Sequence, residues 1–283
     1  MQEAIELAGI FIDAGPVGQY KKRDAKVYTL KDVNRGTIYD GPLIILVNGH
    51  SASASEMVAG TLQDYNRAII VGSPTYGKAT AQIVLPMDTT IDLKTDITKI
   101  QAYNYLKTTV SQLYRATGNT AQARGVLPDI DVPDLLQAHP KREADEPNAL
   151  ISSPIESSKY FTPYPPIAIG NLQAAAKKMV EASRYFTLLK KYIEYEKLNT
   201  QKKEVNLKLA DVITEENKNV QDKPDSNAIK FEKASYTVQN NSFEKQQMQV
   251  NARLKELNEQ WTEFLLEDPY LHIAYNTMLL MIK

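Results

Sequence analysis

Residues 43–82 read LIILVNGHSASASEMVAGTLQDYNRAIIVGSPTYGKATAQ, and this stretch decides the fold. It contains two short apolar runs, at 43–47 and 68–71, each followed by a glycine turn signal, so it predicts two buried strands. The residues between them, 53–65, predict a helix. A strand, a helix and a second strand within about 30 residues are typical of a βαβ crossover with parallel strands. The sequence therefore predicts an α/β core.

The composition excludes several classes of function. The chain has 283 residues, which at roughly 150 residues per domain suggests two domains. Its 33 basic and 34 acidic residues leave no excess of positive charge to neutralise phosphates, so we expect no nucleic-acid partner. Cysteine is absent, and the histidines are too few and too dispersed to suggest a metal site: His50, His139 and His272. We expect no cofactor. No apolar run approaches the roughly 20 residues that span a bilayer, so we expect no transmembrane segment.

Three parts follow one another along the chain. Residues 1–135 form the predicted α/β core. Residues 136–170 form a predicted irregular connector, because the stretch 133–166 holds seven of the fourteen prolines. Residues 171–283 form a predicted helical region, although the stretch 200–250, rich in Lys, Glu, Asn and Gln, favours a solvated helix or partial disorder.

Apolar residues in the helical region recur at three- and four-residue steps, as on amphipathic helices. Asp268 and Pro269 predict the N-cap and first position of the last helix. Its predicted apolar face contains Leu271, Ala274, Tyr275, Met278, Leu279 and Ile282. Isolated amphipathic helices bury too little surface to be stable, so we expect this region to pack on the core. The expected contacts are Tyr185, Phe186, Tyr192, Trp261 and Phe264.

Ser53 is the first candidate for chemistry. A serine at the first turn of a helix that follows a buried strand can project its hydroxyl into a cleft, where free backbone N–H groups favour an oxyanion. The alternative is purely structural, since Ser53 with Glu56 three residues later also fits a capping box. Ser51 and Ser55 in the same tract are rival nucleophiles.

A serine nucleophile needs a base. His50 is only three residues away from Ser53, and this spacing gives no support for a triad. A lysine can act as the base where burial lowers its pKa from the free value of about 10.4. Lys78, next to Gly77 after the second strand, is the candidate, and a solvated turn lysine is its structural alternative.

The segment 72–79, GSPTYGKA, nearly matches the phosphate-binding loop G-x-x-x-x-G-K-[ST]. Ala79 lacks the hydroxyl that would bind Mg²⁺. Residues 80–85 predict a strand ended by Pro86 rather than the helix whose N-terminus holds the phosphates. These differences disfavour nucleotide binding.

The ordered motifs of the core resemble those of the carboxy-terminal processing, or tail-specific, proteases, a family of Ser/Lys peptidases. The matching segments are the strand end 46–48, SASASE at 51–56, LQDYNRA at 62–68, PTYGK at 74–78 and Gln82. A second block, from Tyr114 to Ile130, is similar to the family's Y-R-x-x-G…Q…G-[IV]-x-P-D-I stretch. Residues 148–150, 205–207 and 268–271 resemble the helical C-terminal region of the periplasmic branch.

This resemblance implies a crotonase-like core and a serine endopeptidase that acts near the C-termini of unfolded or tagged proteins. Carried over by position, Ser53 is the nucleophile, Lys78 the general base and Gln82 the residue that orients Lys78. The backbone N–H of Ala54 is one expected oxyanion donor. The alternative is a non-catalytic peptide-binding or scaffolding relative in which Ser53 is only a cap.

The chain departs from the family pattern at three places. Ala79 replaces a common glycine, and residues 94–107 match no motif and predict an insertion. The family's PDZ domain and Gly-rich oxyanion turn are not matched, which implies a fragment with weak or no activity of its own. The resemblance also implies a periplasmic location.

Overall fold

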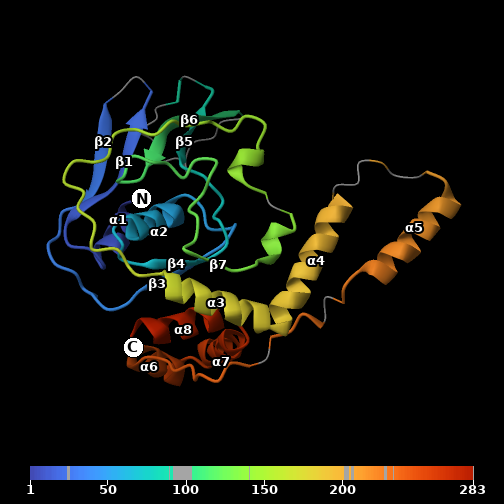
Figure 1. Ribbon diagram of the computed structural model, residues 1–283. Coiled ribbons are helices and arrows are strands. Elements are labelled where there is room, and N and C mark those ends of the chain that lie inside the picture. Colours follow the sequence, from blue (N-terminus) through green and yellow to red (C-terminus); the bar gives the residue numbers. More distant parts are fainter. Residues whose placement is uncertain are drawn as a thin grey trace.

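The computed structural model describes residues 1–23, 26–88, 90–91, 104–139, 141–200, 204, 207–225, 228–231 and 233–282. Figure 1 shows two sheets with helices between them, and a group of C-terminal helices below. The predicted α/β core followed by a helical region is confirmed.

The parallel sheet contains the predicted βαβ unit. Its strands are β3 (Ile44–Val47), β4 (Ile69–Gly72) and β7 (Ile130–Asp131), in the order β3-β4-β7, and both neighbouring pairs are parallel. Helix α2 (Ala54–Asp64) makes the crossover from β3 to β4. Gly72 has a φ of 133°, and a Cβ there would overlap the Val47 carbonyl oxygen, so only glycine fits where these two strands end.

The second sheet is antiparallel, in the order β2-β1-β6-β5. Its strands are β1 (Gly15–Lys22), β2 (Val27–Asp32), β5 (Thr80–Pro86) and β6 (Tyr105–Tyr114). The strand predicted at 80–85 is thus confirmed as β5. Of the predicted insertion, residues 105–107 pair with β5 in this sheet, and residues 94–103 lie outside the described part of the chain.

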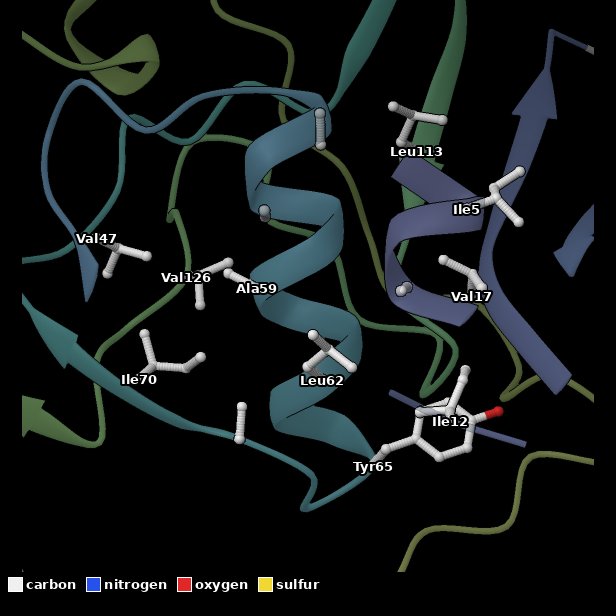
Figure 2. Close-up of a cluster of buried hydrophobic side chains, with 14 residues drawn as sticks. Ile5, Ile12, Val17, Val47, Ala59, Leu62, Tyr65, Ile70, Leu113 and Val126 are labelled. Atoms are coloured by element: carbon white, nitrogen blue, oxygen red, sulfur yellow. The ribbon is translucent and has the colours of Figure 1, made fainter. Parts of the chain in front are cut away.

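The main core lies around α2, between the two sheets. Figure 2 shows Ala59 and Leu62 of α2 next to Val47 and Ile70 of the parallel sheet. Residues of α1 (Gln2–Gly9), β1 and β6 complete the same cluster, among them Ile5, Val17 and Leu113. Each fully buried aliphatic side chain of this kind contributes about 1.5–3 kcal/mol, so the cluster holds α2, and the loop before it, in place.

Strand β4 joins this core to a second one because its side chains alternate between the faces of the sheet. Ile70 faces the α2 cluster, whereas Ile69 and Val71 belong to a cluster on the other face. That second cluster includes residues of α3 (Gly170–Ala182), α4 (Arg184–Thr200) and α8 (Pro269–Met281). The helical region therefore packs directly on the parallel sheet, as expected, and Phe186 and Tyr185 take part in it.

Two of the expected contacts are wrong. Trp261 and Phe264 lie on α7 (Ala252–Leu266) and are 63% and 58% exposed. Neither α7 nor α6 (Ser242–Val250) has a buried residue. The two aromatic rings instead contact each other edge to face, with centroids 5.7 Å apart. Tyr192 is only partly buried.

The last helix begins as predicted but presents a different face. The Asp268 carboxylate accepts from the N–H groups of Tyr270 and Leu271, and Pro269 occupies the first position. The buried residues of α8 are Pro269, Ile273, Ala274 and Thr277. Of the predicted apolar face only Ala274 is buried, so the helix is rotated relative to the expectation.

Two short 3₁₀ turns, η2 (Leu135–Gln137) and η3 (Glu143–Asp145), lie in the predicted connector, and its described residues form no strand or α-helix before α3 begins at Gly170. Phe161 and Ile167 pack against the two cores, whereas Tyr160 is exposed. Helix α5 (Leu209–Asp222) projects away from the body in Figure 1. The boundaries at 135 and 170 stay a prediction. Within the described ranges, no helix combines the length and apolar character needed to cross a bilayer.

Phe186 provides a test of how the helical region is held. Its side chain is 1% exposed, so Phe186→Ala should lower the free energy of unfolding by about 3–5 kcal/mol. Phe264→Ala, on the exposed face of α7, should change it by no more than about 0.5 kcal/mol. Chemical denaturation of both variants checks this. Equal losses of unfolding free energy in the two variants would contradict the packing of Phe186 in the second core.

Candidate active site

The candidate site lies where β3 and β4 end. Parallel strands have their carboxyl ends at the same edge of a sheet, and ligands of α/β proteins bind in the crevice at that edge. The loop after β3 carries Ser53, and the loop after β4 carries Lys78. Both residues line one small pocket, together with Glu56. Its other lining residues are Val17, Met57, Thr61, Ala79, Leu113, Tyr114, Arg115 and Ala121.

Ser53 has an unusual backbone. Its φ is 59° and its ψ is −113°, a conformation that costs a non-glycine residue on the order of 1–3 kcal/mol. The residue occupies the N-cap position of α2 and forms a capping box with Glu56, but the approach of its hydroxyl to the Glu56 N–H falls short of a full cap hydrogen bond. Ser53 also lines the pocket.

The other two serines of the tract are placed differently. The Ser51 hydroxyl accepts from the Asn48 N–H at 3.2 Å and closes the turn after β3. Ser55 is exposed on the first turn of α2. Of the three serines, only Ser53 lines the pocket with Lys78.

Glu56 connects the two loops. Its side chain is 3% exposed, and its carboxylate accepts four hydrogen bonds. The donors are Ser53 N–H at 2.8 Å, Thr75 Oγ1 at 2.5 Å, Gly77 N–H at 2.7 Å and Lys78 N–H at 2.9 Å. Burial raises the pKa of Glu56, while the hydrogen bonds from Thr75 and the three backbone N–H groups act in the opposite direction. One carboxylate thus fixes the backbone of both candidate catalytic residues.

The spacing of Ser53 and Glu56 predicts a capping box and no further role for Glu56. The capping box is present, and in it the carboxylate accepts from Ser53 N–H. The three donors from residues 75–78 could not be expected from local spacing, since they come from the next loop.

Gln122 and Glu143 hold the segment around Lys78 through hydrogen bonds that are separate from those of Glu56. Gln122 accepts from Ala79 N–H at 2.7 Å and donates to the Glu143 carboxylate at 2.9 Å. The Glu143 N–H in turn donates to the Tyr76 carbonyl at 3.2 Å. Gly77 has a φ of 92°, which favours glycine. The segment 76–79 is therefore held on both sides of Lys78.

Gln82 makes no hydrogen bond to Lys78 among the described residues. Its amide donates to Thr80 Oγ1 at 2.8 Å and to Thr109 Oγ1 at 3.3 Å, and none of its hydrogen bonds within the described chain reaches Lys78. The pairing of β5 with β6 shifts between Ala81 and Gln82. The extra residue of this irregularity lies on β6, whereas Lys78 precedes β5, which begins at Thr80, so the rule that strand residues four apart face the same side does not apply to Lys78 and Gln82.

Ala54 is the first residue of α2, where backbone N–H groups lack a partner four residues earlier. Its N–H donates no hydrogen bond to the described residues. The chain after Lys78 continues into β5 and not into a helix, so the geometry of a phosphate-binding loop is missing. Across the described residues, no three His, Asp or Glu side chains are grouped in a way that could hold a metal ion.

The C-terminal end of α2 is also anchored. The Arg115 guanidinium donates to both Asp64 oxygens, at 2.8 and 2.7 Å, and to the Gly60 carbonyl at 2.9 Å. Bidentate pairs of this kind add geometric specificity as well as energy. Arg115 also borders the pocket, so α2 is held at both ends by residues of the site.

Comparisons with known proteins agree with this architecture. Residues 1–132, which include the α/β core, match peptidase family S41. Residues 137–283 match the C-terminal domain of tail specific protease. The chain belongs to the tail-specific protease family, and the resemblance seen in the sequence is confirmed.

Individual relatives match parts of the chain. It is 35% identical over 161 residues to a tail-specific protease of Haemophilus influenzae, covering 57% of this chain and 22% of that protein. It is 32% identical over 133 residues to a carboxy-terminal-processing protease of Bartonella bacilliformis, covering 47% of this chain and 28% of that protein. The solved photosystem II D1 C-terminal processing protease has 26% identity and a TM-score of 0.38, over 46% of this chain and 31% of that chain.

Proposed function

We propose that this chain supplies the nucleophile and the base of a serine endopeptidase that cleaves unfolded or tagged proteins near their C-termini. The proposal is supported above all by the Glu56 carboxylate, which accepts from the backbone of both Ser53 and Lys78 while their side chains border one pocket. Membership of a peptidase family supports the reaction class.

In the proposed reaction Lys78 takes the proton of the Ser53 hydroxyl as the serine oxygen attacks the scissile carbonyl. The N–H of Ala54 donates to the oxyanion that forms. Collapse of this intermediate breaks the peptide bond, and the proton held by Lys78 goes to the leaving amine. Water then hydrolyses the acyl-enzyme, with Lys78 again taking a proton, and Ser53 is restored.

Gln82 is the least supported member of the proposed site. It lies on β5 close to Lys78, but to orient the lysine its amide would have to leave Thr80 and Thr109. We therefore assign the positioning of Lys78 first to Glu56 and Gln122, whose hydrogen bonds to residues 77–79 are present.

The alternative function is peptide binding without cleavage, with Ser53 acting only as a cap. The lack of a full cap hydrogen bond at the Ser53 hydroxyl favours catalysis over this alternative, because a capping serine uses its oxygen to accept from the first turn of the helix. The strained backbone of Ser53 also favours catalysis, since such conformations cluster at functional sites.

The proposal places this region within a longer periplasmic protein that also carries a PDZ domain. The matched relatives support a longer protein, since the chain covers 22% and 28% of their lengths. In this setting the other regions deliver the substrate and supply further oxyanion donors, each of which is typically worth about 10² to 10³ in rate.

The test is to incubate the full-length protein with an unfolded protein that has an apolar C-terminal tail, and to map the products by mass spectrometry. The proposal expects internal cleavage sites near the C-terminus. Binding of the same protein without any product would instead support the scaffolding alternative.

A further inference from the structure

A second cavity lies at the same edge of the parallel sheet as Ser53. It has a volume of about 280 Å³ and is lined by residues from the loops after all three parallel strands. Gly49 and His50 follow β3, and Ser73, Pro74 and Tyr76 follow β4; Leu136, Gln137, His139, Lys141 and Arg142 follow β7. This is the edge at which ligands of parallel sheets bind. We call this cavity the cationic crevice.

The charge of the crevice has one sign. Its lining includes Lys141 and Arg142, which are cationic at neutral pH, and His50 and His139, but no Asp or Glu. Neither Lys141 nor Arg142 forms an ion pair within the described ranges. The crevice is therefore lined by two positive side chains that have no ion-pair partner among the described residues.

Several carboxylates lie near the crevice without lining it, and Glu143, Asp145 and Glu146 act electrostatically on Tyr76, which does line it. Glu196 lies 3.2 Å from His139 Nε2. Asp134 lies beneath the crevice and accepts from Ser73 Oγ at 3.0 Å and from Leu136 N–H at 2.8 Å. Glu143 accepts from Gln122, and Asp145 accepts from the backbone of Arg142. These carboxylates stay negative and reduce the positive potential of the crevice, but among the described residues none of them forms an ion pair with Arg142 or Lys141.

The crevice is within reach of a peptide bound at Ser53. His50 precedes Ser53 by three residues, and Tyr76 precedes Lys78 by two, so their Cα atoms lie at most about 11 and 8 Å apart. An extended peptide advances about 3.3 Å per residue. A group three or four residues from the scissile bond would therefore reach this cavity.

We propose that the cationic crevice binds a carboxylate of the peptide substrate, and that the site therefore prefers an acidic group a few residues from the cleaved bond. Arg and Lys bind carboxylates through charge-assisted hydrogen bonds. This inference rests on the proposed function, since it places a peptide at Ser53. The carboxylate comes either from an Asp or Glu side chain or from the C-terminus of the substrate.

The test compares peptides that differ at a single group. One series places Glu or Gln at each of the four positions on either side of a fixed cleavage site, and a second pair ends in a carboxylate or an amide. The full-length protein should cleave one Glu peptide, or the free-acid peptide, with a kcat/KM about tenfold above that of its neutral partner. A preference for a Glu peptide would show that the crevice binds a side-chain carboxylate, and a preference for the free-acid peptide would show that it binds the C-terminus.

The double variant Lys141→Gln/Arg142→Gln should reduce this ratio to near one. The matched control Lys177→Gln removes an exposed charge on α3 and should keep the ratio. If the double variant instead lowered the rates for both peptides and left their ratio unchanged, as general damage to the fold would, the proposal would be overturned. A ratio near one in the unmodified protein would overturn it as well.

A binding measurement separates this inference from the proposed function. Fluorescence anisotropy of the same labelled peptides on Ser53→Ala should show about tenfold tighter binding of the acidic member, and the double variant should abolish the difference. If the protein cleaved the peptides but showed no charge preference in either measurement, carboxylate binding by the crevice would be refuted and the proposed protease function would stand. If the unmodified protein bound the acidic peptide selectively but cleaved neither peptide, carboxylate binding by the crevice would stand and the proposed protease function would be refuted.

Discussion

Ser53→Ala and Lys78→Ala should each lower turnover of an unfolded protein by about 10⁴-fold or more in the full-length protein, because residues that act as one catalytic unit fail together. The double variant should be no slower than either single variant. Ser53→Ala should at the same time change the free energy of unfolding by no more than about 0.5 kcal/mol, since its hydroxyl makes no full cap hydrogen bond. Initial rates and chemical denaturation measure the two effects.

The matched control is Ser55→Ala, which removes an exposed hydroxyl from the same first turn of α2. It should keep full turnover. If Ser53→Ala remained active, or if it lost about 1 kcal/mol of stability with turnover intact, Ser53 would be a cap and the nucleophile assignment would be wrong.

Glu56→Gln should have the second largest effect. A glutamine amide presents one oxygen and one NH₂ group to the four donors that now share the carboxylate, so two donors lose their acceptor. Each unsatisfied buried donor costs about 1–3 kcal/mol, so the two together predict a loss of about 2–6 kcal/mol in the free energy of unfolding. Turnover should fall by about 10²-fold or more, because small displacements of catalytic groups have effects of this size.

The control for this change is Glu194→Gln, on an exposed position of α4, which should alter neither quantity. The two variants are compared by urea denaturation and by kcat at saturating substrate. A Glu56→Gln protein with unchanged turnover would show that the connection between the two loops has no part in catalysis.

The same carboxylate predicts a pH dependence with opposite signs for activity and stability. Burial raises the pKa of Glu56 above its ordinary value of 4.5. Its contribution to stability is therefore complete below the unfolded pKa and is lost as the pH rises through the folded pKa. Activity should rise over the same interval, because only the ionised carboxylate accepts from all four donors. Rate and unfolding measurements from pH 4 upward test this, and Glu56→Gln should lack both transitions.

Local patterns determined the elements of the core. The apolar runs at 43–47 and 68–71, with their glycine turns, were sufficient to predict β3, α2 and β4 and their parallel pairing, because strand burial and turn geometry depend on neighbouring residues. The N-cap of α8 was predictable for the same reason. Ser53 and Lys78 were identified by motifs within the same stretch, and the fold places them at one pocket.

The tertiary structure decided what depends on distant partners. Periodicity indicates that a helix has an apolar face, but not which neighbour covers it, so Trp261 and Phe264 were expected to be buried and are exposed. Lys78 lies before β5 begins, so strand periodicity does not relate it to Gln82, whose amide donates to Thr80 and Thr109 instead. Glu56 accepts from residues 19 to 22 positions away because two strands of one parallel sheet end side by side. The sequence by itself determined which residues are available for the site, and only the packing of one loop against the next decided how they are held.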